Sequence, residues 1–209
     1  PLVTSVGAYA FRYDTGILSV TINGAMTLGA YAFSECSNNQ SLTAPQVTAI
    51  PEYAFNRNTN LTALDLPEVL TVGRSAFDYC SSLPTLSLPK VESIDTYAFG
   101  NNTSLTEVSL PLCTTLNMEV FGTCTSLTKA YLPEVTTMGT RTFYKNTSLL
   151  TLGENAIYLP KITIIPEGTF RECTSMVSAP LHDGITSIGN NAFYQDTNLQ
   201  SVTIPTSVK

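Results

Sequence analysis

The spacing of phenylalanine constrains this chain more than any other feature. The 209 residues contain nine phenylalanines, and the first seven stand 22 residues apart: Phe11, Phe33, Phe55, Phe77, Phe99, Phe121 and Phe143. The gaps to Phe170 and Phe193 are 27 and 23 residues. A constant period of this length indicates a solenoid, in which each unit buries its apolar edge only against its neighbours. We therefore expect a single domain over residues 1–209, built from about nine repeats of 22–23 residues.

The bulk composition fits a folded chain and argues against two classes of partner. Apolar residues make up 43% of the chain, charged residues 12%, and the net charge is −6. Because no basic run is present, a nucleic-acid backbone is a poor candidate partner. No apolar run approaches the ~20 residues of a membrane span.

The core of each repeat reads LxxLxLPxVxxI, as from Leu83 through Leu86, Leu88 and Pro89 to Ile94. The alternation in its LxL part predicts a strand. Proline cannot donate to a strand ladder, so it should end that strand after about three or four residues. Stacking of the repeats should then align these short strands as a parallel sheet along one side of the coil.

The segment that carries each phenylalanine predicts a turn followed by a short helix. Glycine or proline often stands four residues before the phenylalanine, as Gly73 and Pro51 do. Proline fixes φ near −65°, so a left-handed residue is excluded there and a helix start fits both residue types. We expect a helix of one or two turns, as at residues 97–99, with the phenylalanine pointing inward.

From Phe33 to Phe170, the third residue after each phenylalanine alternates between cysteine and asparagine, as Cys80 and Asn102 do, and the first and last repeats have Asp14 and Asp196 there. Asparagine can bond nearby backbone groups and hold a tight turn there. A buried cysteine can fill the same place as a weak donor.

The full pattern, which adds an alanine before the phenylalanine as in Ala76-Phe77 and a cysteine at Cys80, resembles the BspA-like subclass of leucine-rich repeats over essentially the whole chain. The resemblance implies an α/β-type, right-handed coil with short parallel strands on one face and short helices or turns on the other. It also implies a bacterial or protist surface protein that adheres to host molecules or other cells, without a catalytic site. Asn39 departs from the pattern at a leucine position, and five extra residues fall around Gly153 and Ala156.

The sequence gives little support for a catalytic, cofactor-binding or metal-binding site. The single histidine, His182, falls in a segment that reads as a surface turn. Cys36, Cys80 and Cys124 occupy equivalent positions two repeats apart, which places them about 10 Å from one another, whereas a disulfide needs Cα atoms within roughly 7 Å. We expect all five cysteines to be buried free thiols and no metal cluster to form.

Charged residues recur as neighbours in adjacent repeats. Glu68 shares a position with Lys90, and Glu134 shares one with Lys161 once the insertion is allowed for. Exposed pairs of this kind contribute about 0–1 kcal/mol. We interpret these pairs as residues that keep the protein soluble and fix the register of adjacent repeats, and not as a catalytic acid–base pair.

The outward residues of the predicted strands are the best candidates for binding. They stand eight and ten residues after each phenylalanine, and their chemistry is most varied in the middle of the chain. The partner-binding candidates are Asp65, Ser87, Glu107, Ser109, Lys129 and Tyr131. Concave sheets of solenoids commonly bind partners. The alternative interpretation is a solvated polar face without a ligand.

A second stripe of outward residues contains Tyr9, Tyr31, Tyr53 and Tyr97, each two residues before its phenylalanine. Stacked tyrosines there would hold a sugar or a protein side chain, or they would only cover that side of the coil.

Together with what the resemblance implies, these observations favour a secreted or cell-surface, bacterial module that binds a host or cell-surface protein or glycan through its strand face, with no enzymatic activity. The alternative is a structural spacer that displays another domain. Pro1 and Lys209 both fall inside a repeat, so we expect a fragment of a longer chain, uncapped at both ends. Open ends of a solenoid favour weak end-to-end self-association.

Overall fold

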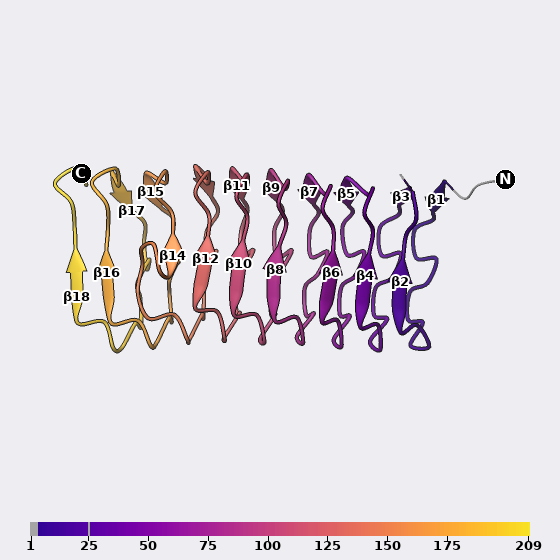
Figure 1. Cartoon of the computed structure of the whole chain (residues 1–209). Coiled ribbons are helices and arrows are strands. Elements are labelled where there is room, and N and C mark those ends of the chain that lie inside the picture. Colours follow the sequence, from indigo (N-terminus) through magenta and orange to yellow (C-terminus); the bar gives the residue numbers. More distant parts are fainter. Residues whose placement is uncertain (1–3, 25) are drawn as a thin grey trace.

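The chain forms a parallel β-solenoid of about nine turns. The structure, a computed structural model, describes residues 4–24 and 26–209. Successive turns lie side by side in chain order, so the two ends of the chain lie at opposite ends of an elongated molecule (Figure 1). Every strand pair in the described residues is parallel, as stacked repeats require.

The first row of strands confirms the prediction from the LxL motif. Its members are β2 (Ser19–Thr21), β4 (Ser41–Thr43), β6 (Ala63–Asp65), β8 (Thr85–Ser87), β10 (Glu107–Ser109), β12 (Lys129–Tyr131), β14 (Ile157–Tyr158), β16 (Ser178–Pro180) and β18 (Ser201–Thr203). Equivalent residues pair directly, as Val108 does with Ala130. The middle residue of a typical strand is buried and its two neighbours face outward, as in β8. The repeat period therefore sets the register and the outward face together.

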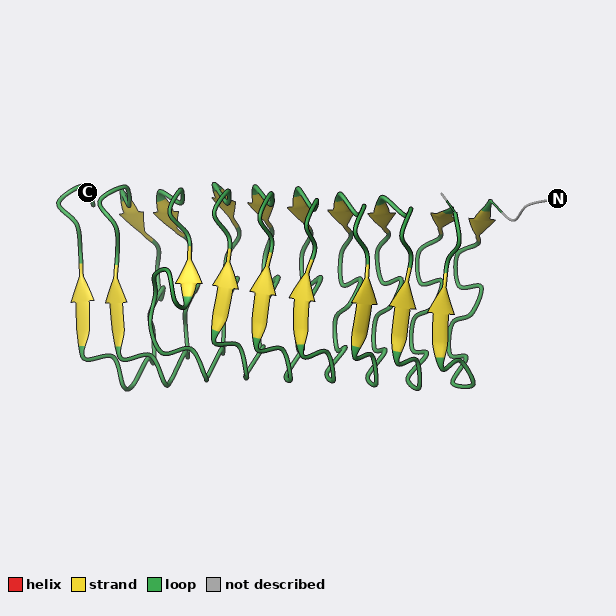
Figure 2. Ribbon diagram, in the orientation of Figure 1, coloured by secondary structure: helices red, strands yellow, loops and turns green. Residues whose placement is uncertain are grey.

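A second row of two-residue strands lies on another side of the coil and was not predicted (Figure 2). It contains β1 (Ser5–Val6), β3 (Thr27–Leu28), β5 (Ala49–Ile50), β7 (Thr71–Val72), β9 (Ser93–Ile94), β11 (Thr115–Leu116), β13 (Thr137–Met138), β15 (Ile164–Ile165) and β17 (Ser187–Ile188). The second residue of such a strand points inward, as Ile50 and Val72 do. These strands lead directly into the turns that carry the phenylalanines.

The prediction of short helices is wrong. Residues 4–24 and 26–209 contain no helix (Figure 2), and hence none long and apolar enough to cross a membrane. Residues two before and two after each phenylalanine have positive φ, which interrupts any helix. The set is Tyr9, Tyr13, Tyr31, Glu35, Tyr53, Arg57, Ser75, Tyr79, Tyr97, Asn101, Glu119, Thr123, Arg141, Lys145, Gly168, Glu172, Asn191 and Gln195.

Hydrogen bonds between turns explain why this backbone is preferred to a helix. The N–H of Phe55 donates to the carbonyl of Ala76 in the next repeat at 2.8 Å. The N–H of Asn56, one residue later, donates back to Tyr53 at 3.2 Å. Alternate N–H groups thus bond to the neighbouring coil and to their own turn, whereas a helix would direct all of them along one chain. The turns therefore extend the ladder of hydrogen bonds around the coil.

The phenylalanines form one continuous stack through the core. Successive rings from Phe11 to Phe193 have centroids 5.0–6.1 Å apart and planes within 19° of parallel. Beside the stack, Cys80 Sγ donates to the carbonyl of Phe55 at 3.3 Å, and Asn102 Nδ2 donates to that of Phe77 at 3.1 Å. Cysteine and asparagine thus each donate to the carbonyl of the phenylalanine in the preceding repeat, which is the donor role predicted for them. All five cysteines are buried free thiols, which confirms that prediction.

The first row of strands is interrupted between β6 and β8. These two strands belong to separate sheets. At the residue that precedes the strand, Thr106 donates its N–H to Pro84 at 2.9 Å, and Thr62 donates to Gln40 at 2.9 Å. Pro84 occupies this position in the intervening repeat and has no N–H to offer to Thr62. The missing donor accounts for the break.

The five extra residues form a loop before β14, as expected. Gly153 has a φ of 118° and donates its N–H to Ile157 at 3.0 Å. Ile157 pairs with Ala130 and so takes the strand position that the repeat count assigns to Leu152. Leu152 forms only an isolated bridge with Ile157. An apolar cavity of about 240 Å³ lies between β14 and β16, which are not paired to each other.

Candidate functional site

A shallow groove of about 310 Å³ lies on the outward face of the sheet formed by β8, β10, β12 and β14. Five of the six predicted binding residues line it: Ser87, Glu107, Ser109, Lys129 and Tyr131. They meet because the parallel register places Glu107 beside Lys129 and Ser109 beside Tyr131. The strand pairing thus gathers the most varied side chains of the face into one hollow.

Asp65, the sixth predicted residue, is not part of this groove. It lies at the end of β6, which belongs to the sheet on the far side of the Pro84 interruption. Glu154 and Ala156 line the groove instead, and both come from the inserted loop. The repeat pattern gives no signal for them, because inserted residues have no counterpart in other repeats. Counting the strand position from Ile157 rather than Leu152 would have placed Tyr158 beside Tyr131 and the end of this loop beside Lys129.

The groove carries one ion pair and one unpaired carboxylate. Lys129 Nζ lies 3.0 Å from Glu107 Oε1, and both side chains are more than half exposed. An exposed pair of this kind contributes about 0–1 kcal/mol, so both groups exchange partners easily. Glu154 is exposed at the rim. Lys129 is the single cationic residue among the side chains that line the groove.

An aromatic ring forms one wall of the groove. Tyr131 is 49% exposed, and Tyr158 stacks on it with a centroid distance of 5.7 Å and an interplanar angle of 6°. The ring normals therefore run along the ladder of strands. On the other side of Tyr131 the neighbour is Ser109, whose small side chain leaves the second face of the ring open toward the groove.

The second tyrosine stripe has a different geometry. Tyr9, Tyr31 and Tyr53 stack face to face, with centroids 4.9 and 4.5 Å apart. Arg12 packs over Tyr31 at 5.2 Å and pairs with Glu35 at 3.2 Å. Because the ring of Tyr31 is covered on both faces by its neighbours, the stripe presents ring edges and hydroxyls. This favours the interpretation that these residues cover the turn side of the coil.

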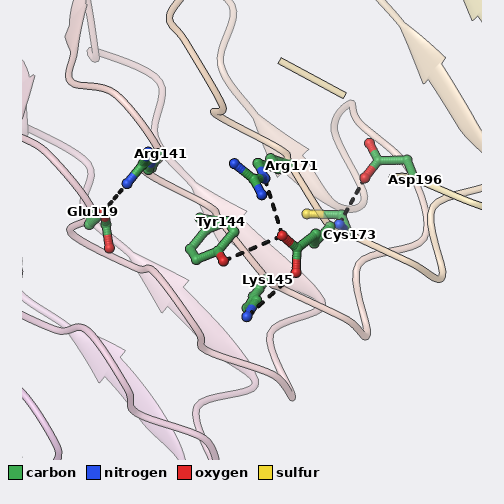
Figure 3. A network of polar contacts seen from close by, with 8 residues as sticks. Glu119, Arg141, Tyr144, Lys145, Arg171, Cys173 and Asp196 are labelled. Atoms are coloured by element: carbon green, nitrogen blue, oxygen red, sulfur yellow. Dashed lines mark hydrogen bonds and ion pairs between the residues drawn. The ribbon is translucent and has the colours of Figure 1, made fainter. Parts of the chain in front are cut away.

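A polar network joins the turns on either side of the insertion, where Tyr144, Lys145 and Arg171 (labelled in Figure 3) all contact the carboxylate of Glu172. This carboxylate accepts from Arg171 Nε at 3.1 Å and from the Tyr144 hydroxyl at 3.4 Å, and it pairs with Lys145 at 3.5 Å. In the next repeat, Asp196 Oδ1 accepts from the backbone N–H of Cys173 at 2.8 Å (Figure 3). Burial raises the pKa of the Asp196 carboxyl to about 7. With three donors already bound, Glu172 serves to hold adjacent coils together.

The other charged residues singled out in the sequence form ion pairs between adjacent repeats, and His182 lies at a surface turn. Lys90 pairs with Glu68 at 2.6 Å, and Lys161 pairs with Glu134, which confirms both ladders. His182 is exposed in a turn, where its Nδ1 accepts from the N–H of Gly184 at 3.1 Å. In the described part of the chain, no three His, Cys, Asp or Glu side chains come together to hold a metal ion.

Comparison with known proteins extends the resemblance noted above. The family model for the BspA type leucine rich repeat region matches residues 2–99, 48–152 and 151–209. No curated protein matches the chain.

Solved structures share the fold at low sequence identity. A leucine rich cell surface protein from Faecalibacterium prausnitzii A2-165 is 23% identical, with a TM-score of 0.54 over 99% of this chain and 72% of its own. The T. pallidum leucine rich repeat protein is 20% identical, with a TM-score of 0.62 over 93% of this chain and 82% of its own. The pneumococcal vaccine antigen PcpA is 19% identical, with a TM-score of 0.65 over 98% of this chain and 64% of its own.

Proposed function

The chain belongs to the BspA type leucine rich repeat family, and from this premise we propose that it is part of a secreted or cell-surface bacterial module. Its role is to bind a host or cell-surface protein or glycan. The contact surface is the groove lined by β8, β10, β12 and the loop before β14.

The gathering of unlike side chains in this groove is the observation that carries the proposal. Tyr131, Lys129 and Glu107 stand together there with serine hydroxyls. In contrast, β2 and β4 at the other end of the face present only serine and threonine outward. Tyrosine is enriched among the residues that carry the binding energy of interfaces, and charged groups set specificity and association rate, so the groove is the favoured contact surface.

Two further observations support the proposed location and the kind of activity. The F. prausnitzii neighbour is described as a cell surface protein, and PcpA is described as a vaccine antigen.

Burial raises the pKa of Cys36 and Cys113 to about 11 and that of Cys124 to about 12, which disfavours thiolate nucleophiles. We therefore propose binding without catalysis. A net charge of −6 argues against nucleic acid as the partner.

Binding of the labelled protein to an array of purified extracellular-matrix proteins and mucin glycans tests this function. For any ligand retained by the wild type, Glu107→Lys and Lys129→Glu should each weaken binding by about tenfold, because each places like charges side by side in the groove. Glu68→Lys is the matched control, since Glu68 forms the same kind of exposed pair with Lys90 outside the groove. Equal loss in the control, or no loss in either groove variant, would refute the site.

The alternative function is a spacer that displays another domain. The elongated shape, with the two ends of the chain far apart, is the observation that favours it (Figure 1). An array on which the wild type retains no protein and no glycan would support this alternative over the binding module.

A further inference from the structure

The open face of Tyr131 determines which ligand chemistry the groove can accept. One face of this ring is covered by Tyr158 and the other lies above Ser109. A flat apolar surface stacked there would meet the small side chain of Ser109 on β10. The C–H face of a sugar ring and a planar side chain both have this shape.

Polar groups lie at a suitable distance from that ring face. Glu107 and Ser109 are two positions apart on β10, and Lys129 and Tyr131 are two positions apart on β12. In a strand this separation is about 6.6 Å, comparable to the width of a pyranose ring. A ring stacked on Tyr131 above Ser109 therefore has hydroxyls next to the Glu107–Lys129 pair.

The charges of the groove favour a neutral ligand. Lys129 is the single cation of the lining and already pairs with Glu107 at 3.0 Å. Glu154 adds a carboxylate at the rim. With two carboxylates and one cation in the lining, an anionic sugar would meet a net negative charge. Neutral hydroxyls can instead donate to Glu107 and accept from Lys129.

The size of the groove favours a small ligand over a protein surface. Its volume of about 310 Å³ is at the lower end of the range for small-molecule sites, roughly 300–1,000 Å³. A specific protein partner needs about 800 Å² of contact on each side, which would extend onto the uniform serine and threonine columns.

We propose that this groove binds a neutral pyranose of a glycan. The sugar ring stacks on the face of Tyr131 next to Ser109, and its hydroxyls bond Glu107 and Lys129. The inference rests on the proposed function and names the ligand class of the same site.

Saturation-transfer NMR and titration with defined trisaccharides test the ligand class. The probes are cellotriose, maltotriose, mannotriose and triacetylchitotriose at millimolar concentration, with a sialylated trisaccharide as the anionic comparison. At least one neutral probe should bind, with its ring protons saturated from Tyr131, and the anionic probe should bind at least about tenfold more weakly.

The variant Ser109→Tyr distinguishes stacking of a sugar on Tyr131 from non-specific binding to the protein surface. A tyrosine at this position extends the Tyr131–Tyr158 stack and covers the open face, so sugar binding should fall by about tenfold or more. Thr43→Tyr, at the equivalent strand position outside the groove, is the matched control and should bind as the wild type does. Tyr131→Phe keeps the ring face and should retain binding, whereas Tyr131→Ala should lose it.

Three outcomes distinguish failure of the inference from failure of the function. Binding of neutral probes that Ser109→Tyr abolishes supports the inference. If no probe binds while an array protein binds through Glu107 and Lys129, the sugar inference is refuted and the binding function stands. If neither a probe nor an array ligand binds, both are refuted.

Discussion

At the scale of single residues, the position three after each phenylalanine shows how one buried hydrogen bond can be made by different side chains. Cys124 Sγ donates to Phe99 at 3.3 Å, and Asn58 Nδ2 donates to Phe33 at 2.8 Å. Asp196 occupies the same position but has no proton to donate when ionised. Its Oδ2 is buried without a hydrogen-bond partner, and burial raises its pKa from 3.8 to about 7.

Asp196→Asn should therefore stabilise the protein in a pH-dependent way. Between pH 4 and 7 the folded state binds more protons than the unfolded chain, so the wild type loses stability as pH rises through this window. The asparagine variant cannot titrate. We expect equal stability near pH 4 and a gain of about 1–3 kcal/mol for the variant at pH 8, measured by urea unfolding at both values. A gain that is the same at both pH values would contradict this account.

The thiols should be unreactive in the folded protein. All five are buried, and burial raises the pKa of each. Because the thiolate is the reactive form, an aromatic disulfide reagent at pH 8 should label none of them in the native state and all five in denaturant. Rapid labelling of a native thiol would show that its side of the core opens.

At the scale of elements, the first row of strands could be predicted, whereas the turns and the second row of strands could not. The LxL motif repeats on a fixed period, so both the register of β8, β10 and β12 and their outward residues follow from counting. The turns depend on left-handed residues such as Tyr53 and Arg57, which carry no glycine signal. Their conformation is stabilised by bonds to the next coil, and reasoning from local helix propensity does not include such contacts. The two-residue strands are too short to show alternation.

Pro84→Thr should join the two sheets that Pro84 separates. The new N–H should donate to the carbonyl of Thr62, as Thr106 donates to Pro84 in the next repeat. The added bond contributes about 0.5–1.5 kcal/mol, but the loss of proline costs about 0.4–1 kcal/mol through the unfolded chain. Overall stability should change little, so the decisive measurement is hydrogen exchange. The amide of residue 84 should be protected like that of Thr106, and rapid exchange there would refute the explanation of the break.

At the scale of the whole molecule, the core is a single stack rather than a central cluster. Among the phenylalanines, each ring stacks only on those of the adjacent repeats, so a ring in the middle is enclosed by protein and a ring at the end is not. Phe99 is fully buried, while Phe11 at the start of the stack is 42% exposed. The same substitution at these two positions should therefore have unequal effects.

Phe99→Ala should destabilise the protein by about 3–5 kcal/mol, the usual cost of such a cavity. Phe11→Ala, the matched control, should cost less than half as much because its ring is already partly in water. If Phe99→Ala does not fold, Phe99→Leu provides a milder comparison. Chemical unfolding of these variants measures the difference, and equal losses at the two positions would contradict the stacked core.

The candidate site could be predicted in part, because its residues follow from two different rules. Ser87, Glu107, Ser109, Lys129 and Tyr131 follow from the outward strand positions. The exclusion of Asp65 depends on a missing backbone donor at Pro84, and the inclusion of Glu154 depends on the path of an inserted loop. Both are exceptions to the repeat, and a period alone does not locate exceptions.

The central claim is that the molecule binds through its strand-face groove and not through its turn face. Tyr131 and Tyr9 are equally suited to test it, since they are 49% and 54% exposed on opposite kinds of surface. The most direct measurement compares Tyr131→Ala with Tyr9→Ala on the array of matrix proteins and mucin glycans. We predict that Tyr131→Ala abolishes the wild-type signal and that Tyr9→Ala preserves it. Preserved binding in Tyr131→Ala, or loss only in Tyr9→Ala, would contradict the account.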